Sequence, residues 1–299
     1  MRNRIWLFML MIMMLIPVSP AASAEILATE YVLSGRNVYS PTVLRTVNGV
    51  RRVWFGGWLN DGDRTDIIYM IDEAAPGAWT APVVVLERPG QLVNDPTVLR
   101  HPIYPTWLFM YFTVLIDPND TSNNQIGFAS SIDEGRSWWD HGIIIGRDNG
   151  LDQCGAWSPS ALVVGSEIWV YFHGNLSAVC SSLQVYRVRL DLNGWQRLAT
   201  EIVTLPGPAT NVDVNSQQGQ FVLWADAPGL RAISRYISTD GLTFMGSPGA
   251  PVINAGEALI NTPHCEVVSN DLCRLWFGFS PSGSVTDFSS IHDWTISAP

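Results

Sequence analysis

The sequence of 299 residues contains no lysine, so its basic residues are 17 arginines, set against 27 aspartates and glutamates. Schiff-base catalysis and the phosphate-binding P-loop both depend on a lysine amine, so the composition excludes them. The formal net charge is −10 at pH 7, and no cluster of basic residues offsets it. Because such a chain repels phosphate backbones, we expect no nucleic-acid partner.

Long apolar segments are scarce as well. The first 24 residues combine a basic start, the apolar run IWLFMLMIMMLIPV and a small-residue ending, Ala22-Ser23-Ala24. This pattern is typical of a secretory signal, and the run falls short of the roughly 20 residues that a membrane anchor needs. We therefore predict a signal peptide over 1–24 and one secreted or periplasmic domain over 25–299. We expect no transmembrane segment in the mature chain.

Cysteine is rare, with four residues in the chain. In an oxidising compartment an even count favours two disulfides. Cys265 and Cys273 flank one predicted turn, so we favour the pairing 265–273 together with Cys154–Cys180. Metal ligation is the alternative, but no CxxC spacing supports it.

A short phrase returns along the chain: YSPTVL at 39–44, NDPTVL at 94–99 and WSPSAL at 157–162. An aromatic-rich run follows each copy. When spacing rather than identity is followed, two more copies are found around Val212 and Pro263. Five repeats of roughly 50–60 residues, each made of short β-rich runs, are typical of propeller blades.

The predicted fold is therefore all-β, a single five-bladed β-propeller. A β-sandwich is the alternative, but a sandwich has no reason to repeat one phrase five times. In the second repeat we predict strands near 96–100, 107–113, 125–131 and 141–145. Residues 26–33 are predicted to form an extra strand that completes the last blade and removes its open edge.

Two turns carry a further signature. SIDEGRSW at 131–138 fits the Ser-x-Asp-x-Gly-x-x-Trp turn called an Asp-box, and STDGLTF at 238–244 is a shorter relative. In such a turn the aspartate accepts backbone N–H bonds, and glycine takes a positive φ. We expect Asp133 and Asp240 to be structural.

The repeated phrase begins the innermost strand of each blade, which lines the central channel. Side chains alternate along a strand, so the residues before and after each anchor are expected on one side. All ten of these residues are polar. They are Ser40, Asp95, Ser158, Asn211 and Thr262 before the anchors, and Thr42, Thr97, Ser160, Asp213 and His264 after them.

These features together resemble the five-bladed glycoside hydrolases, which include arabinanases, β-xylosidases, fructosidases and mannoside phosphorylases. The resemblance rests on the five-fold period, the Asn-Asp-Pro-Thr phrase at 94–97, the turn at 238–244 and the aromatic second strands. The turn at 131–138 and the run WTAPVVVL at 79–86 are similar to sialidases. The motifs specify fold much better than substrate.

The arabinanase-like pattern implies three acids at the starts of channel strands: an aspartate base in the first blade, a second aspartate that tunes pKa, and a glutamate acid. Asp95 matches an aspartate of this pattern, whereas Ser40 stands at the first-blade position. Asn261 and Trp157 stand where the glutamate is expected, and the arginine of the sialidase pattern falls on Tyr39. Neither mechanism transfers intact.

Glycoside hydrolysis requires two carboxyl groups, about 5.5 Å apart for retention or about 6.5–9.5 Å apart for inversion. The acids available at the channel end are Asp95, Asp213 and Glu266, and these are our candidate catalytic residues. Asp95 and Asp213 come from blades two apart, which places them across the mouth. Hydrogen bonding to water and backbone is their alternative role. Glu266 is expected on the other side of its strand.

Eight further residues are candidates for substrate binding, because they occupy equivalent places at the strand starts. They are Tyr39, Ser40, Asn94, Trp157, Ser158, Asn211, Asn261 and His264. We expect no cofactor. The alternative is a calcium ion held by Asp95, His173 and His264, since calcium prefers oxygen ligands, but a hydrogen-bonded channel histidine is favoured.

We therefore predict a secreted carbohydrate-active protein of glycoside-hydrolase type, monomeric, with its site at the channel mouth and a carbohydrate or glycoconjugate as its partner. The alternative is a non-catalytic propeller that binds a glycan or an envelope partner. Ser40 favours this binder, whereas Asp95 with Asp213 favours the enzyme. The glycan and its linkage are not encoded in any motif.

Overall fold

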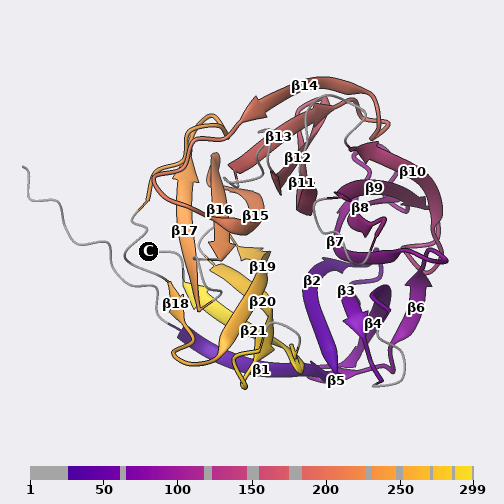
Figure 1. The fold of residues 1–299 in the computed structure, drawn as a ribbon, viewed down its shortest axis with the longest axis vertical. Coiled ribbons are helices and arrows are strands. Elements are labelled where there is room, and N and C mark those ends of the chain that lie inside the picture. The colour runs from indigo at the N-terminus through magenta and orange to yellow at the C-terminus, as the bar shows by residue number, and fades with distance from the viewer. Residues whose placement is uncertain are drawn as a thin grey trace, which may run out of the picture.

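The computed structural model describes residues 26–60, 65–117, 123–146, 155–174, 184–226, 231–246, 252–269, 272–284 and 287–297. The predicted signal peptide, Cys154 and Cys180 lie outside these residues. The described residues contain no α-helix, and none of them belongs to a helix that could cross a membrane. Five antiparallel sheets stand in a ring around a central channel (Figure 1).

Each sheet is one blade. Blade one consists of β2 (Asn37–Arg45), β3 (Arg51–Trp58), β4 (Ile67–Ala75), β5 (Ala78–Trp79) and β6 (Val83–Leu86). Blade two consists of β7 (Leu92–Arg100), β8 (Leu108–Leu115), β9 (Asn124–Ser131) and β10 (Trp139–Ile145). Blade three consists of β11 (Ala156–Val164), β12 (Glu167–Gly174), β13 (Gln184–Leu190) and β14 (Arg197–Ile202). Blade four consists of β15 (Thr210–Gln217), β16 (Gln220–Asp226), β17 (Ala232–Ser238) and β18 (Ile253–Asn254).

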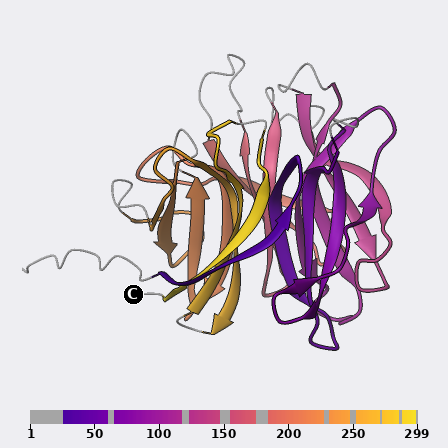
Figure 2. The ribbon, with the colours of Figure 1, turned by 90° about the horizontal axis from the view of Figure 1, so that it is seen from below.

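The fifth blade confirms the predicted closure. It contains β19 (Leu259–Ser269), β20 (Leu272–Ser280), β21 (Ser290–Ser297) and, as its outermost strand, β1 (Ile26–Ser34). β1 pairs antiparallel with β21, and the two strands run side by side in Figure 2. Because the first strand and the last repeat share one sheet, the two ends of the ring are joined by backbone hydrogen bonds.

The disulfide predicted between Cys265 and Cys273 is present. It joins β19 to β20 with the two Cα atoms 5.7 Å apart. Both cysteines are buried in the core of blade five. The pairing of Cys154 with Cys180 stays a prediction.

Aromatic side chains of the second strands hold successive blades together. Trp54 and Trp276 are at most 1 % exposed. Across three seams, an aromatic N–H or O–H donates to the carbonyl of a turn glycine in the next blade. The three bonds are Trp54 Nε1 to Gly135 (3.2 Å), Tyr111 Oη to Gly194 (3.1 Å) and Tyr171 Oη to Gly241 (2.8 Å).

The turns at 131–138 and 238–244 are organised by their aspartates. Asp133 Oδ1 accepts two backbone N–H bonds of its own turn, at 3.1 and 3.0 Å, and Asp240 Oδ1 accepts two at 2.8 Å. These bonds lower the pKa of the Asp240 carboxyl to about 2, because they stabilise its charged form. Gly135 has φ +79° and meets Trp54, so a Cβ there would lie 2.5 Å from the indole.

Candidate functional site

Every innermost strand is bulged at the repeated phrase. The residue before each anchor has a positive φ, between 46° and 52°, and the pairing with the second strand shifts register there. These residues are Ser40, Asp95, Ser158, Asn211 and Thr262. Non-glycine residues rarely adopt this conformation, so the repeat encodes one local geometry five times. The strict alternation expected from sequence is therefore interrupted, and the two polar positions form two successive layers of the channel.

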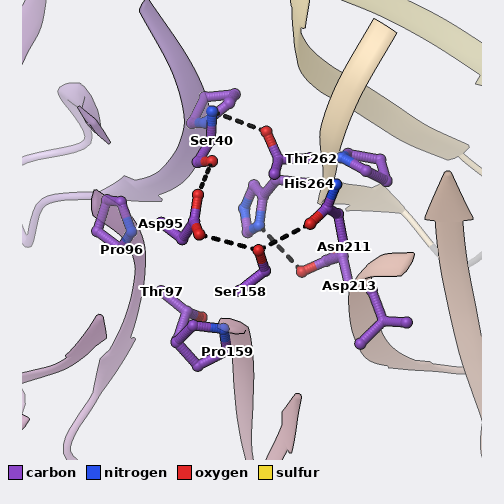
Figure 3. Close-up of a pocket in the computed structure, with 13 residues that line it drawn as sticks. Ser40, Asp95, Pro96, Thr97, Ser158, Pro159, Asn211, Asp213, Thr262 and His264 are labelled. Carbon is purple, nitrogen blue, oxygen red and sulfur yellow. Dashed lines mark hydrogen bonds and ion pairs between the residues drawn. The ribbon is translucent and has the colours of Figure 1, made fainter. Parts of the chain in front are cut away.

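The first layer contains a series of hydrogen bonds between the strand starts (Figure 3). Ser40 Oγ donates to Asp95 Oδ1, and Ser40 N donates to Thr262 Oγ1 at 2.8 Å. Ser158 Oγ lies 2.9 Å from Asp95 Oδ2 and 2.8 Å from Asn211 Oδ1. These bonds link strand starts from all five blades. Asp226 Oδ2 completes the ring, because it accepts from both Asn211 Nδ2 and Thr262 N.

Asp95 is the most heavily bonded member of this ring. Besides Ser40 and Ser158, the Thr113 hydroxyl donates to Asp95 Oδ2 at 3.0 Å. Burial raises the pKa of the Asp95 carboxyl, and its hydroxyl partners offset part of that rise. Among the described residues, its side-chain hydrogen-bond partners are these three hydroxyls.

The bulges also leave backbone N–H groups that cannot pair within their own sheets, and the preceding blade supplies the acceptors. The acceptor residues are located at or near the last residue of the second strand of their blades. The three bonds are Ser158 N to Thr113 Oγ1 (2.9 Å), Asn211 N to His173 Nδ1 (3.3 Å) and Thr262 N to Asp226 Oδ2 (3.3 Å).

The second layer joins each blade to the next. In four seams, a backbone N–H donates to the polar side chain that follows the anchor of the preceding blade. The bonds are Val98 N to Thr42 Oγ1 (3.3 Å), Ala161 N to Thr97 Oγ1 (3.2 Å), Val214 N to Ser160 Oγ (2.9 Å) and Cys265 N to Asp213 Oδ2 (2.9 Å). This ring accounts structurally for the polar positions after the anchors.

His264 completes the second layer. Its Nδ1 lies 3.3 Å from Asp213 Oδ1, and its Nε2 lies 3.4 Å from the Val43 carbonyl oxygen of blade one. A carboxylate and a carbonyl can only accept, so both contacts are hydrogen bonds only when both ring nitrogens carry protons. Burial lowers the pKa of His264, but Asp213 and the Val43 carbonyl outweigh burial, and the net pKa is raised.

The two layers leave little room between them. The cavity that Asp95, Asp213 and His264 share has a volume of about 30 Å³. A cavity of this size holds water and cannot hold a sugar ring. Space for a group as large as a sugar ring therefore has to lie at one of the two ends of the channel, beyond these layers.

The end at which the innermost strands begin is what we call the mouth. There, Tyr39 Oη donates to Asp66 Oδ2 at 2.6 Å, and Asn94 Nδ2 lies 2.8 Å from Tyr39 Oη and 3.1 Å from Asp66 Oδ2. Burial raises the pKa of the Asp66 carboxyl to about 6, and the Asp95 charge adds to the rise. Asp66 Oδ1 and Asn94 Oδ1 are buried and accept no hydrogen bond from the residues that the structure describes.

The opposite side of the mouth combines rings and amides. Trp157 stacks on His173, with ring centroids 5.3 Å apart and planes 11° apart. Burial lowers the pKa of His173 to about 4, so this imidazole is neutral near pH 7. Asn211 Nδ2 donates to Asn261 Oδ1 at 2.6 Å and to Asp226 Oδ2 at 2.5 Å.

Sequence reasoning missed Asp66 and Asp226, because it followed only the innermost strands. Asp226 ends β16, and β16 runs antiparallel to β15, so its end lies beside the start of β15. Asp66 immediately precedes β4, and its backbone carbonyl accepts from Val93 N at the start of blade two. Both residues could have been found by looking for an acidic residue at the end of the second strand of a blade or at the start of its third strand.

Glu266 lies at the other end of the channel. Arg51 Nε lies 3.2 and 3.1 Å from its two oxygens, and Arg45 Nη2 lies 3.4 Å away. Glu266 and Arg100 line a wider cavity of about 520 Å³, formed by the ends of the innermost strands. Glu266 is therefore remote from the mouth and neutralised by arginine. Across the described ranges, no group of three or more His, Cys, Asp or Glu side chains is arranged to hold a metal ion.

No family model and no curated protein matches the sequence. Solved structures match its fold over most of their length. An α-L-arabinofuranosidase from Lactobacillus brevis superposes with TM-score 0.67 at 13% identity, covering 88% of this chain and 91% of that one. A family 117 glycoside hydrolase from Zobellia galactanivorans superposes with TM-score 0.64 at 15% identity, covering 90% of each chain. A GH43 endo-arabinanase from Bacillus licheniformis superposes with TM-score 0.62 at 16% identity, covering 89% of this chain and 96% of that one. The chain therefore has the five-bladed β-propeller fold of the arabinanase-type glycoside hydrolases.

Proposed function

We propose that the protein is an exported, carbohydrate-active propeller that binds a neutral glycan at the mouth and hydrolyses a glycosidic bond there. The observation that carries this proposal is a group of three buried carboxyls: Asp66, Asp95 and Asp226. The pKa of each is raised chiefly by burial, and the Asp95 charge raises the pKa of both others. A carboxyl whose pKa is raised by burial suits the general acid of glycoside hydrolysis.

The glycan is proposed to be neutral because three carboxyls, those of Asp66, Asp95 and Asp226, gather at the mouth. Among the described residues, their hydrogen-bond partners are hydroxyl, side-chain amide and backbone N–H groups rather than arginines. A uronate or a phosphorylated sugar would meet like charge without a counterion. Hydroxyl-bonding side chains do surround the mouth, with Tyr39, Trp157 and Asn261 each partly exposed. Such polar groups around an aromatic ring fit a sugar.

Asp95 is the candidate for proton transfer, since its charge acts on both neighbouring carboxyls. Asp213, the other member of the pair considered from sequence, lies in the second layer, where Cys265 N and His264 occupy it. Its catalytic role stays a prediction that mutagenesis has to decide. Export stays a prediction that rests on residues 1–24.

A second candidate function is glycan binding without turnover. One observation favours it: the Asp95 carboxylate already receives bonds from Ser40, Ser158 and Thr113. These hydroxyl donors lower the pKa of Asp95, so they oppose the protonated form that a general acid needs. Ser40 also favours the binding function, because it stands where the arabinanase-like pattern has its base.

The test is a screen of the mature protein against neutral aryl glycosides and neutral oligosaccharides, with turnover and binding scored separately. We expect Trp157→Ala to lose most of the glycan affinity, because it removes the ring at the mouth. The matched control is Ser216→Trp, which fills part of the wider cavity at the opposite end and should leave affinity unchanged. Loss of binding in the control alone would move the site to that end.

A further inference from the structure

The Tyr39 hydroxyl stands between two groups that fix its direction. It donates to Asp66 Oδ2 at 2.6 Å and accepts from Asn94 Nδ2 at 2.8 Å. A phenol has one proton and two lone pairs, so with Asp66 ionised only one lone pair remains for a ligand. In that state the remaining position on Tyr39 Oη is an acceptor, and the Tyr39 side chain is partly exposed at the mouth.

Protonation of Asp66 has a defined place to occur. A proton on Oδ1 would be buried with no acceptor among the described residues, since Oδ1 has no hydrogen-bond partner there. A proton on Oδ2 would instead point at Tyr39 Oη, 2.6 Å away. Because an unpaired buried donor costs about 1–3 kcal/mol, Oδ2 is the favoured position.

The consequence falls on Tyr39. Once Asp66 Oδ2 donates to the phenol, Tyr39 Oη accepts from both Asp66 and Asn94, and its own proton turns outward. We propose that Tyr39 is a reversible contact of the mouth, which accepts from a ligand when Asp66 is ionised and donates to it when Asp66 is protonated. This rests on the proposed function, because it assigns the ligand to the mouth.

The groups that face Asp66 can be named from each neighbouring element. Tyr39 comes from β2, and Asn94 and Asp95 come from β7. The Tyr39 and Asn94 bonds favour the ionised form of Asp66, whereas burial and the Asp95 charge oppose it, and the pKa is about 6. The reversal therefore falls in the range between mildly acidic and neutral pH.

The exchange sorts ligands by their hydrogen-bonding groups. A sugar hydroxyl can donate or accept, so it suits Tyr39 in both states. A uronate carboxylate only accepts, so it suits Tyr39 only when Asp66 is protonated. Neutral glycans should bind across the pH range, and uronates only on its acid side.

The first experiment needs no glycan. The tyrosines of the mature protein are labelled with ¹³C at Cζ, and the Tyr39 signal is the one missing from Tyr39→Phe. We expect that signal to titrate with a midpoint near 6 in the wild type and not in Asp66→Asn. The matched control is Asp140→Asn, which changes a carboxylate paired with Arg88 at the outer edge of blade two and should keep the titration. A flat Tyr39 signal in the wild type would overturn the inference.

Reciprocal labelling covers the case in which Asp66→Asn does not fold. The Tyr39 bond lowers the pKa of Asp66, so the ¹³C-carboxyl titration of Asp66 should move upward in Tyr39→Phe. An unmoved titration would also overturn the inference.

The second experiment measures xylotriose and trigalacturonate binding by calorimetry at pH 5 and pH 8. We expect xylotriose affinity to be similar at both values and trigalacturonate affinity to be roughly tenfold or more higher at pH 5. Trigalacturonate affinity that is equal at both values contradicts the exchange. A Tyr39 signal that titrates in a protein that binds no glycan at all refutes the proposed function and leaves the Tyr39–Asp66 exchange standing.

Discussion

His264 of blade five faces the Val43 carbonyl of blade one, 3.4 Å from Nε2 to oxygen, and this contact closes the second layer of the channel. The other four seams use a backbone N–H donor and a side-chain acceptor, whereas this seam uses a side-chain donor. Asp213 lies 3.3 Å from the other ring nitrogen. The two contacts are hydrogen bonds at the same time only when the imidazole is protonated.

This dependence predicts a pH-sensitive contribution to stability. The pKa of His264 is raised in the folded state, so its contribution is full below the unfolded value near 6.5 and is lost as pH rises through the folded pKa. Urea unfolding of wild type and His264→Gln should therefore give a free-energy difference that is larger at pH 6 than at pH 9. Equal differences at both values would mean that the imidazole is neutral throughout. His264→Ala should cost more than His264→Gln at either pH, because alanine leaves the Val43 carbonyl without a donor.

The fold could be predicted from sequence because its signals are local and repeated. The phrase around Pro41, Pro96 and Pro159 marks the innermost strands, and residues 26–33 were identified as the closing strand that β1 forms. In blade two, β7 begins at Leu92, four residues earlier than predicted, because the strand continues through the bulge at Asp95. A bulge has no unique sequence signature, so the periodicity of apolar residues places the strand start too late.

The site was harder to predict, because its chemistry arises between blades. The polar residues before and after each anchor were expected on one side of the strand, and Asp213 was a candidate catalytic residue. In the structure, Thr42, Ser160 and Asp213 all accept from the backbone of the next blade. Asp66 and Asp226 reach the mouth from strands that do not line the channel. The geometry of the ring decides which blade a given side chain bonds to. Spacing along the chain does not encode that choice.

The disulfides give the second prediction. The bond between Cys265 and Cys273 closes a short loop, and by loop entropy its removal should cost about 2.5 kcal/mol. The double variant Cys265→Ser/Cys273→Ser should therefore unfold at lower urea concentration than wild type.

Non-reducing peptide mapping of protein recovered from the culture medium should also find Cys154 joined to Cys180, and an N-terminus at Glu25. A free thiol at Cys154, or an intact N-terminus, would contradict the expectation of export.

The third prediction separates the roles of Asp95 and Asp213. Asp213→Asn removes the charge that pairs with His264, so it should lower stability and leave glycan turnover unchanged. Asp95→Asn should reduce turnover by roughly 10²–10⁴-fold, the usual cost of losing acid–base catalysis. The comparison requires kcat on the best neutral substrate together with the melting temperature of each variant. If Asp213→Asn lowers kcat as strongly as Asp95→Asn with no loss of stability, the two acids act as the pair considered from sequence. If neither variant changes kcat, the acid is elsewhere.

The last prediction concerns Ser40, whose hydroxyl donates to Asp95 Oδ1 across the first seam. Ser40→Asp introduces a carboxyl at the position where the arabinanase-like pattern has its base. Because Ser40 is 4 % exposed and touches Asp95, the two carboxyls would share one proton rather than both ionise. The variant should therefore be less stable than wild type at pH 7, and the deficit should shrink toward pH 4, as the pair becomes fully protonated. The matched control, Ser40→Asn, carries no charge and should show a deficit that does not vary with pH. Urea unfolding at the two pH values checks both variants, and a deficit in Ser40→Asp that is independent of pH would contradict the shared proton.

Turnover is the second readout for Ser40→Asp. If this variant hydrolyses a glycan that wild type binds without cleaving, wild type has the binding function, because the added carboxyl is then the one missing component of catalysis.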